Sequence, residues 1–303
     1  MFKTFPEFSK LTLKDREEYE AFIKDFPPIG DISFAGLMTW WDSPSGVEVS
    51  ILDNNLVVHY WRPGDEENSG LSLIATNKID ESICTIFDYL RERNMPEKLV
   101  NVPEFVIGEI QYHELFRLSE QRCYNEYVMP TTRFFPLKNI GQIRRGRIER
   151  QLKKFGESNI TMRSLDLEDE DQRGLLLSMA EKWCPRNLNN FGSVGLEALK
   201  KCIDSADQLG MENVCFFNKQ EMLGFCLYRL TPDKNYAILM HIKATNVHTL
   251  GFELIGYMLA RWFSAQGIAQ ANLTEDWGRM RLRMFMLTLG PVNFFRKYTI
   301  EPA

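Results

Sequence analysis

The run ENVCFFNKQEMLGFCLYRLTPDKNYAILMHIKA, residues 212–244, contains three apolar segments separated by short polar turns. The segments 212–220, 221–231 and 236–244 have the length and apolar content of β-strands. Short connections of this kind join antiparallel neighbours in a sheet. This part of the sequence therefore predicts three successive antiparallel strands.

Helices and further strands are predicted on both sides of these strands. A helix at 250–267 and a strand at 268–275 follow them. Before them come a basic helix at 141–157, a strand at 159–166, and helices at 169–184 and 194–210. Strands that alternate with helices indicate a mixed α/β unit with helices on both faces of its sheet.

The first part of the chain shows a similar order of elements. Thr12 caps an amphipathic helix that ends before Pro27. We then expect a short helix at 33–42, a hairpin of strands 46–54 and 55–63, a strand at 70–76, a helix at 80–94, a strand at 98–105 and a helix at 106–121. We predict two units, residues 1–128 and residues 129–303, which pack closely because no flexible linker separates them.

Composition and charge exclude several classes of protein. The 303 residues are 44% apolar and 25% charged, which excludes a mainly disordered or fibrous chain. A net charge of −5 argues against a surface that is basic throughout. Six scattered cysteines without zinc-type spacing indicate reduced thiols and no metal site. Because there is no apolar leader and no run of about 18 apolar residues, we expect a cytoplasmic protein without a membrane span.

One region departs from the acidic character of the chain. Residues 142–154 carry six cations against a single acidic residue. A solvated helix would explain such a run of charge, but the repulsion between the cations favours a phosphate-rich partner. The cations are Arg144, Arg145, Arg147, Arg150, Lys153 and Lys154, and the acidic residue is Glu149.

The connection between the last of the three strands and the next helix offers a second candidate site. Backbone N–H groups at the start of a helix can hold a phosphate or carboxylate, and Gly251 allows close approach. Helix capping by Thr249 or Asn246 explains the same residues. His248 is suited to a general base, whereas His241 lies on an apolar strand, where we expect a hydrogen-bonded core residue.

The segment NLTEDWGRMRLR, residues 272–283, contains two acidic residues, a glycine and three arginines. Glu275 and Asp276 follow a predicted strand, and Gly278 permits a tight bend before a helix. Two interpretations stay open. The charges form an ion network among themselves, or Arg283, held by Asp276, presents a fork to a carboxylate or phosphate.

Together these motifs resemble a known family. MHIKATNVHTLGFELIGYMLA at 240–260, the segment 272–283 and LGPVNFFRKY at 289–298 are similar to the C-terminal domain of phosphatidylglycerol lysyltransferases and their soluble relatives, in which two acetyltransferase-like (GNAT) units are fused. The N-terminal helices also fit, so the resemblance covers nearly the full chain. The matching positions are His241, Ile242, Asn246, Asn272, Asp276, Gly278, Leu282, Arg283, Pro291, Lys297 and Tyr298. The sequence departs from the family pattern at Lys243, Ala244, Thr274, Arg281 and Met286.

The resemblance implies a fold and a class of activity. The expected fold is α/β (α+β), with two tandem GNAT-like units whose mixed, mostly antiparallel sheets are flanked by helices. The expected activity is transfer of an acyl or aminoacyl group, with aminoacyl-tRNA as donor and a small molecule or peptide as acceptor. An acyl-CoA donor is the competing version, and a non-catalytic protein that binds a small anion or a protein partner is the alternative.

Residue roles follow from the same resemblance and from the charges described above. Because two glutamates of the family pattern are missing, an acidic catalytic role falls to Glu275 or Asp276, with His248 as the other candidate base. The basic helix would hold a tRNA backbone through Arg144, Arg145, Arg147, Lys153 and Lys154. Substrate contacts are expected from Asn246, Gly251, Asn272, Arg283 and Lys297.

Overall fold

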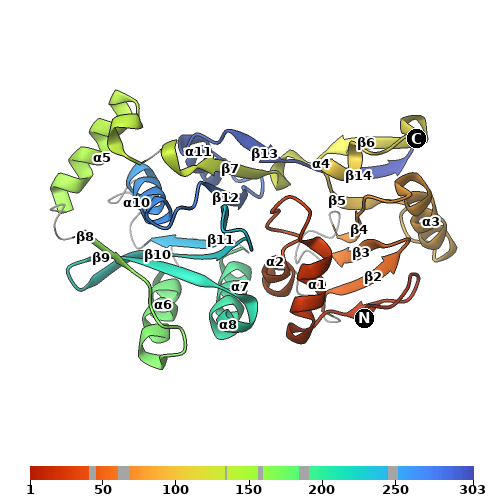
Figure 1. The fold of residues 1–303 in the computed structure, drawn as a ribbon, viewed down its shortest axis with the longest axis horizontal. Coiled ribbons are helices and arrows are strands. Elements are labelled where there is room, and N and C mark those ends of the chain that lie inside the picture. Colours follow the sequence, from red (N-terminus) through yellow and green to blue (C-terminus); the bar gives the residue numbers. More distant parts are fainter. Residues whose placement is uncertain (41–45, 61–68, 134, 156–159, 184–190, 245–251) are drawn as a thin grey trace.

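The computed structural model of the chain describes residues 1–303 except 41–45, 61–68, 134, 156–159, 184–190 and 245–251. Its strands form two seven-stranded mixed sheets, and helices flank both of them (Figure 1). The sheets lie side by side along the long axis, with α1 (Arg16–Ile23) and α2 (Phe34–Trp40) between them. This architecture confirms the predicted fold class.

The first sheet has the strand order β1-β2-β3-β4-β5-β14-β6. Only β4 and β5 run parallel, joined by the helix α3 (Ile79–Glu92), and the other neighbours run antiparallel. The strands are β1 (Ser9–Lys10), β2 (Glu48–Leu52), β3 (Asn55–Tyr60), β4 (Gly70–Ile74), β5 (Leu99–Pro103), β6 (Phe116–Glu120) and β14 (Lys297–Pro302).

The second sheet has the order β13-β7-β12-β11-β10-β9-β8 and repeats this plan. Only β11 and β12 run parallel, joined by α10 (Phe252–Ala265). Its antiparallel centre, β9 to β11, is the set of three strands predicted from the sequence. The strands are β7 (Glu126–Pro130), β8 (Ile160–Arg163), β9 (Glu212–Asn218), β10 (Glu221–Leu230), β11 (Tyr236–Ala244), β12 (Gln270–Glu275) and β13 (Asn293–Phe295).

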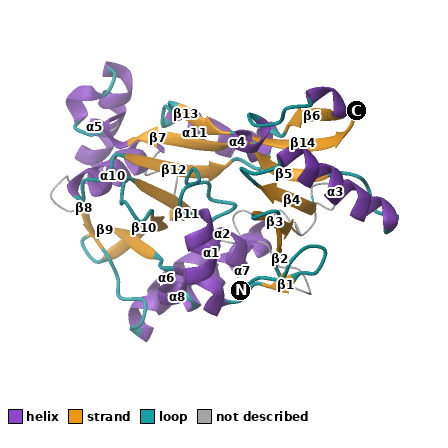
Figure 2. Cartoon of the chain, turned by 45° about the vertical axis from the view of Figure 1, so that its right-hand side comes forward, coloured by secondary structure: helices purple, strands orange, loops and turns teal. Residues whose placement is uncertain are grey.

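The two sheets exchange strands. β7 follows β6 along the chain but inserts between β12 and β13 of the second sheet. β14 follows β13 but inserts between β5 and β6 of the first sheet (Figure 2). Each sheet therefore contains a strand from the other half of the chain, and a domain boundary at residue 128 stays a prediction.

One hydrophobic core joins the two sheets. Val49 and Leu56 of the first sheet belong to the same cluster of buried side chains as Phe225 and Leu227 of the second. The helices α1, α2, α6 (Glu170–Trp183) and α7 (Phe191–Asp204) contribute to this core. α3 packs on the first sheet, whereas α5 (Gln142–Phe155), α10 and α11 (Met280–Thr288) pack on the second. The short helices are α4 (Glu104–Ile107), α8 (Ala206–Leu209), and the 3-10 turns Leu13–Asp15, His113–Leu115, Arg122–Tyr124, Thr131–Arg133 and Leu137–Asn139.

The helix predicted at 106–121 is wrong. α4 ends at Ile107, and Phe116–Glu120 is the strand β6. Phe116 and Leu118 alternate with polar residues, which is the period of a strand. The strand that pairs with β6 is β14, at the other end of the chain, so no local signal marks this pairing.

Candidate functional site

The second sheet opens between β11 and β12. The two strands run parallel. Residues Tyr236 to Ile238 of β11 pair with residues Gln270 to Asn272 of β12. Among the described residues the two strands do not pair further, although β11 continues to Ala244. In open α/β sheets, ligands bind beyond the carboxyl ends of strands where neighbours diverge. The opening is therefore the candidate ligand site.

The end of β12 and the turn that follows it have strained backbone. Thr274 and Trp277 have positive φ angles of 60° and 53°. A β-branched residue such as Thr274 rarely adopts this conformation. The strain coincides with a bulge, because the register of β12 on β7 shifts between Asn272 and Glu275. Bulges and strained residues concentrate beside functional sites, which supports the same location.

Asp276 fixes Arg283 beside this turn. Its fully buried carboxylate accepts hydrogen bonds from Arg283 Nε at 2.7 Å and Nη2 at 3.1 Å. It also accepts hydrogen bonds from the Gly278 N–H at 2.8 Å and from the Tyr127 hydroxyl. Burial opposes ionisation of Asp276, but the hydrogen bonds that it accepts outweigh burial and lower the pKa of its carboxyl. Asp276 is thus an ionised carboxylate with both oxygens occupied.

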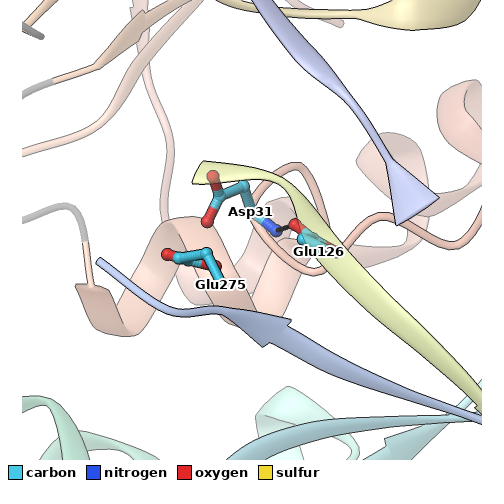
Figure 3. A group of neighbouring side chains, drawn as sticks. All are labelled: Asp31, Glu126 and Glu275. Carbon is cyan, nitrogen blue, oxygen red and sulfur yellow. Dashed lines mark hydrogen bonds between the residues drawn. The ribbon is translucent and has the colours of Figure 1, made fainter. Parts of the chain in front are cut away.

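Three buried carboxylates, from Asp31, Glu126 and Glu275, meet at the end of β12 (Figure 3). Their oxygens lie within 4.8 Å of one another. The buried Lys297 ammonium donates to Glu126 Oε1 at 2.7 Å and also to Asp31. Burial alone would lower the pKa of Lys297, but the three carboxylates raise it by more, so the side chain stays protonated. The ammonium fills the position between Asp31 and Glu126 that a metal ion would need.

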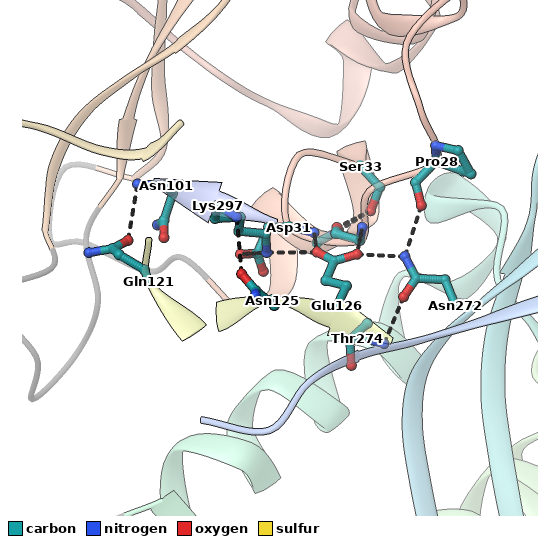
Figure 4. Close-up of polar contacts among 12 residues, drawn as sticks. Pro28, Asp31, Ser33, Asn101, Gln121, Asn125, Glu126, Asn272, Thr274 and Lys297 are labelled. Atoms are coloured by element: carbon teal, nitrogen blue, oxygen red, sulfur yellow. Dashed lines mark hydrogen bonds and ion pairs between the residues drawn. The ribbon is translucent and has the colours of Figure 1, made fainter. Parts of the chain in front are cut away.

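Glu126 is the centre of a network that joins the N-terminal helices to the second sheet (Figure 4). Its Oε2 accepts hydrogen bonds from the Gly30 N–H at 2.6 Å and from the Asn272 amide at 2.5 Å. The Asn272 amide also donates to the Pro28 carbonyl at 2.9 Å, and its own oxygen accepts from the Thr274 N–H at 2.9 Å. The polar atoms of Asn272 are therefore used inside the protein.

The chain is similar to known proteins in structure but not in sequence. No family model and no curated protein matches the sequence. A conserved protein of unknown function from Bacteroides thetaiotaomicron superposes with a TM-score of 0.80 at 19% identity, over 100% of both chains. The C-terminal domain of a putative lysylphosphatidylglycerol synthetase from Agrobacterium fabrum gives 0.64 at 12% identity, over 96% of this chain and 92% of that one. L-PGS from Bacillus licheniformis superposes with a TM-score of 0.58 at 13% identity, over 95% of this chain and 91% of that one.

The chain shares the fold of these proteins. The two sheets, each with one parallel pair, confirm the expected pair of mixed, mostly antiparallel sheets flanked by helices. Within the described part of the chain, no helix has both the length and the apolarity needed to cross a bilayer.

The structure places the predicted site residues in two groups. The first surrounds the end of β12 and consists of Asn272, Glu275, Asp276, Arg283 and Lys297. Asn246, His248 and Gly251 lie outside the described residues. Because Asn272 and Lys297 are buried in internal contacts, the structure gives each of them a role in joining elements. Their contacts with substrate stay predictions.

The basic helix α5 forms the second group. Its Ile148 and Leu152 are buried against the second sheet, and most of its cations are exposed. Burial lowers the pKa of Arg144, and the charges of Arg133 and Arg147 lower it further, against the opposing effect of a glutamate on α10. Arg147 pairs with that glutamate, Glu253, at 2.8 Å. Cations thus follow the length of α5, from Arg144 near its start to Lys154 in its last turn.

A cavity of about 690 Å³ lies at the start of α5. Thr288, the last residue of α11, is part of its wall, whereas Met280, the first residue of α11, follows the strained turn. The cavity and the turn thus lie at opposite ends of α11, roughly 12 Å apart along its axis. The lining residues are Gly141, Gln142, Ile143, Arg144, Arg147, Glu253 and Thr288.

Sequence reasoning missed Asp31, Glu126 and Tyr127. Asp31 follows a pair of prolines and a glycine, so it resembles an ordinary loop residue. Glu126 and Tyr127 begin β7, a strand that was not predicted. The apolar run 127–129 was the available signal for this strand. Only the exchange of β7 into the second sheet makes its first residues neighbours of β12.

Proposed function

We propose that the protein transfers an acyl or aminoacyl group, and that an aminoacyl-tRNA is the donor. The opening between β11 and β12 would receive the acyl end, and the cations of α5 would hold tRNA phosphates. The observation that carries the proposal is the arrangement along α11, with the strained turn at one end and the arginine-lined cavity at the other. The fold shared with a putative lysylphosphatidylglycerol synthetase domain supports a donor of this class.

In the proposed reaction, an amine or hydroxyl of the acceptor attacks the ester carbonyl of the donor. The new acyl bond forms as the ester bond to the ribose breaks, and the proton of the nucleophile passes to the leaving ribose oxygen. The protein would contribute positioning, together with a backbone N–H of the opening that stabilises the oxyanion. Glu275 and His248 are the proposed bases. Asp276 would act through Arg283, which it orients toward a carboxylate or phosphate.

Donor identity is tested with purified full-length protein and two donors, tRNA charged with labelled amino acids and labelled acetyl-CoA. Hydroxylamine serves as a general acceptor, and release of label is compared with the spontaneous rate. We expect release from aminoacyl-tRNA and its loss in Arg283→Ala. Arg281→Ala, an exposed position on the same helix, is the matched control and should keep the activity. Release from acetyl-CoA alone would overturn the proposed donor, and no release from either would overturn the enzymatic function.

Binding of tRNA is tested separately by charge reversal on α5. Lys153→Glu combined with Lys154→Glu should weaken filter retention of tRNA at low salt and flatten its salt dependence. The control reverses two exposed lysines elsewhere, Lys24→Glu with Lys182→Glu, at the same cost in net charge. Equal retention by both double variants would exclude α5 as the tRNA-binding surface.

A further inference from the structure

His241 is a buried side chain whose hydrogen-bonding groups are not used. It lies on β11, beyond Ile238, the last residue in register with β12, and is 3% exposed. Neither ring nitrogen has a hydrogen-bond partner among the described residues. An unsatisfied buried donor or acceptor costs about 1 to 3 kcal/mol. His241 is therefore buried, as expected of a core residue, but the expected hydrogen bond is not formed with the described residues.

A bulge in β11 determines which way His241 points. Leu227 of β10 pairs with His241, but its neighbour Tyr228 pairs with Leu239, so Met240 is an extra residue. In a regular strand without the bulge, residues two apart share a face, so His241 would lie on the face of Leu239, against α10. With it, His241 shares the face of Leu227, toward α2 and α7. The bulge thus turns a polar side chain toward the other face of the sheet, beyond the end of the parallel pairing.

An aromatic side chain lies against His241 and connects β11 to the turn after β12. The ring of Trp40, at the end of α2, stacks on the imidazole with centroids 4.9 Å apart and planes at 27°. Trp40 also contacts Trp277, in the turn after β12, at 5.6 Å between centroids. The indole of Trp40 therefore bridges a residue of β11 to a residue that follows β12. His241 thus lies on the part of β11 that extends beyond its pairing with β12, and Trp40 stacks on it.

Two groups near the ring define its chemical state. Burial and the charge of Lys243 lower the pKa of His241 well below its usual value, so the ring is neutral. The Ala198 carbonyl of α7 lies near enough to raise this pKa, although not in hydrogen-bonding geometry. In the neutral imidazole one ring nitrogen carries the proton and the other is a hydrogen-bond acceptor. Beside a lysine, that acceptor suits a neutral donor group better than a cation.

We propose that His241 contacts the substrate in this opening, where its acceptor nitrogen receives a hydrogen bond from a hydroxyl or a neutral amine. This inference rests on the proposed function, in which that group is the nucleophile of the acceptor. Trp40 fixes the plane of the imidazole, so the hydrogen bond also sets the direction from which the nucleophile approaches. His241 is then a substrate-positioning residue in the second unit.

The direct test observes the imidazole by NMR in full-length protein labelled with ¹⁵N in its histidine rings. The chain has four histidines, so the His241 signals are assigned by their loss in His241→Leu. Hydroxylamine, which carries both a hydroxyl and an amine, is the probe, and acetonitrile, which has no donor, is the control. We expect a saturable shift of one His241 ring nitrogen with hydroxylamine only. An unmoved signal, or an equal shift with acetonitrile, would overturn the proposal.

The second test measures hydroxylamine-dependent release of the aminoacyl group from tRNA. His241→Leu should raise KM for hydroxylamine about tenfold, the effect of losing one hydrogen bond, and leave KM for aminoacyl-tRNA unchanged. His241→Asn or His241→Gln, which presents an amide oxygen, should restore part of this loss. His113→Leu, at an exposed histidine, is the control. An unchanged KM for hydroxylamine in His241→Leu would refute the assignment.

The two tests separate the two proposals. A saturable shift of His241 without any release of label would refute the transferase function but keep the hydroxyl- or amine-binding site. Release of label without a shift would keep the function and refute the role of His241.

Discussion

The Lys297 ammonium lies 2.7 Å from Glu126 Oε1, and these two residues begin the two exchanged strands. Glu126 opens β7, which leaves the first half of the chain for the second sheet, and Lys297 opens β14, which makes the reverse exchange. The buried cluster with Asp31 thus lies where the two exchanged strands begin. The ion pair thus ties together the starts of the two exchanged strands.

Lys297→Met should destabilise the protein strongly. The variant keeps the length of the side chain but leaves buried carboxylates without their cation, which costs about 3 to 5 kcal/mol. Urea unfolding followed by circular dichroism measures the loss. Arg296→Ala, which removes an exposed ion pair with Glu104, should change the free energy of unfolding by under about 1 kcal/mol. Equal effects of the two substitutions would show that the cluster is not held by Lys297.

Because of Asp276, the free energy of unfolding should depend on pH in the acid range. Its folded-state pKa lies below the ordinary value, so its contribution is present above the unfolded pKa of about 3.9 and is lost as the pH falls through the folded value. Asp276→Asn should lower the free energy of unfolding by about 2 to 4 kcal/mol at pH 7, and the gap to wild type should narrow below about pH 3.9. Asp88→Asn, at an exposed carboxylate, is the control. If the difference in free energy of unfolding between wild type and Asp276→Asn stays constant down to pH 2.5, the carboxyl of Asp276 does not have a lowered pKa.

Gly30→Ala should be unfavourable although Gly30 lies in a loop. A Cβ there would lie 2.9 Å from Thr274 Cγ2 and 3.4 Å from Glu126 Oε2, beside a threonine already held at positive φ. We expect a loss of about 1 to 3 kcal/mol. Gly174→Ala, in α6 with open space around it, should instead stabilise by about 0.5 to 1 kcal/mol. Thermal unfolding of both variants measures whether the two changes in the free energy of unfolding have opposite signs.

A fragment of residues 1–128 should not fold by itself. It lacks β14, so β5 and β6 would lose the strand between them, and it carries part of β7 without the second sheet. Circular dichroism and one-dimensional NMR should show no cooperative unfolding transition and no dispersed methyl signals. Adding a peptide of residues 291–303 is the complementary experiment. A fragment that unfolds cooperatively without this peptide would contradict the prediction and support a boundary at residue 128.

Much of the fold was accessible from local patterns. Strands β9 to β11 and the helices around them follow from apolar periodicity, because their partners are neighbours in sequence. β6 and β7 were misread because both pair with segments from the other end of the chain. Periodicity reports the face that a segment buries, not the distant strand that it pairs with.

The site was predictable in part for the same reason. Asp276 and Arg283 were paired from the sequence because a turn and a helix bring them together. Asp31 and Glu126 could not be placed beside Glu275, since only the exchanged topology makes them neighbours. The face on which His241 lies could not be assigned from the sequence, because alternation along β11 cannot reveal a bulge at Met240.

The exchange of β14 also has a consequence for synthesis on the ribosome. β6 emerges early, but the strand that completes its sheet is encoded by the last residues of the chain. At about 5 to 20 residues per second, the first sheet waits roughly 10 to 35 s with β5 and β6 unjoined. The nascent chain must therefore keep two strand edges covered or apart during that interval, and folding of the first sheet finishes only after β14 has been synthesised.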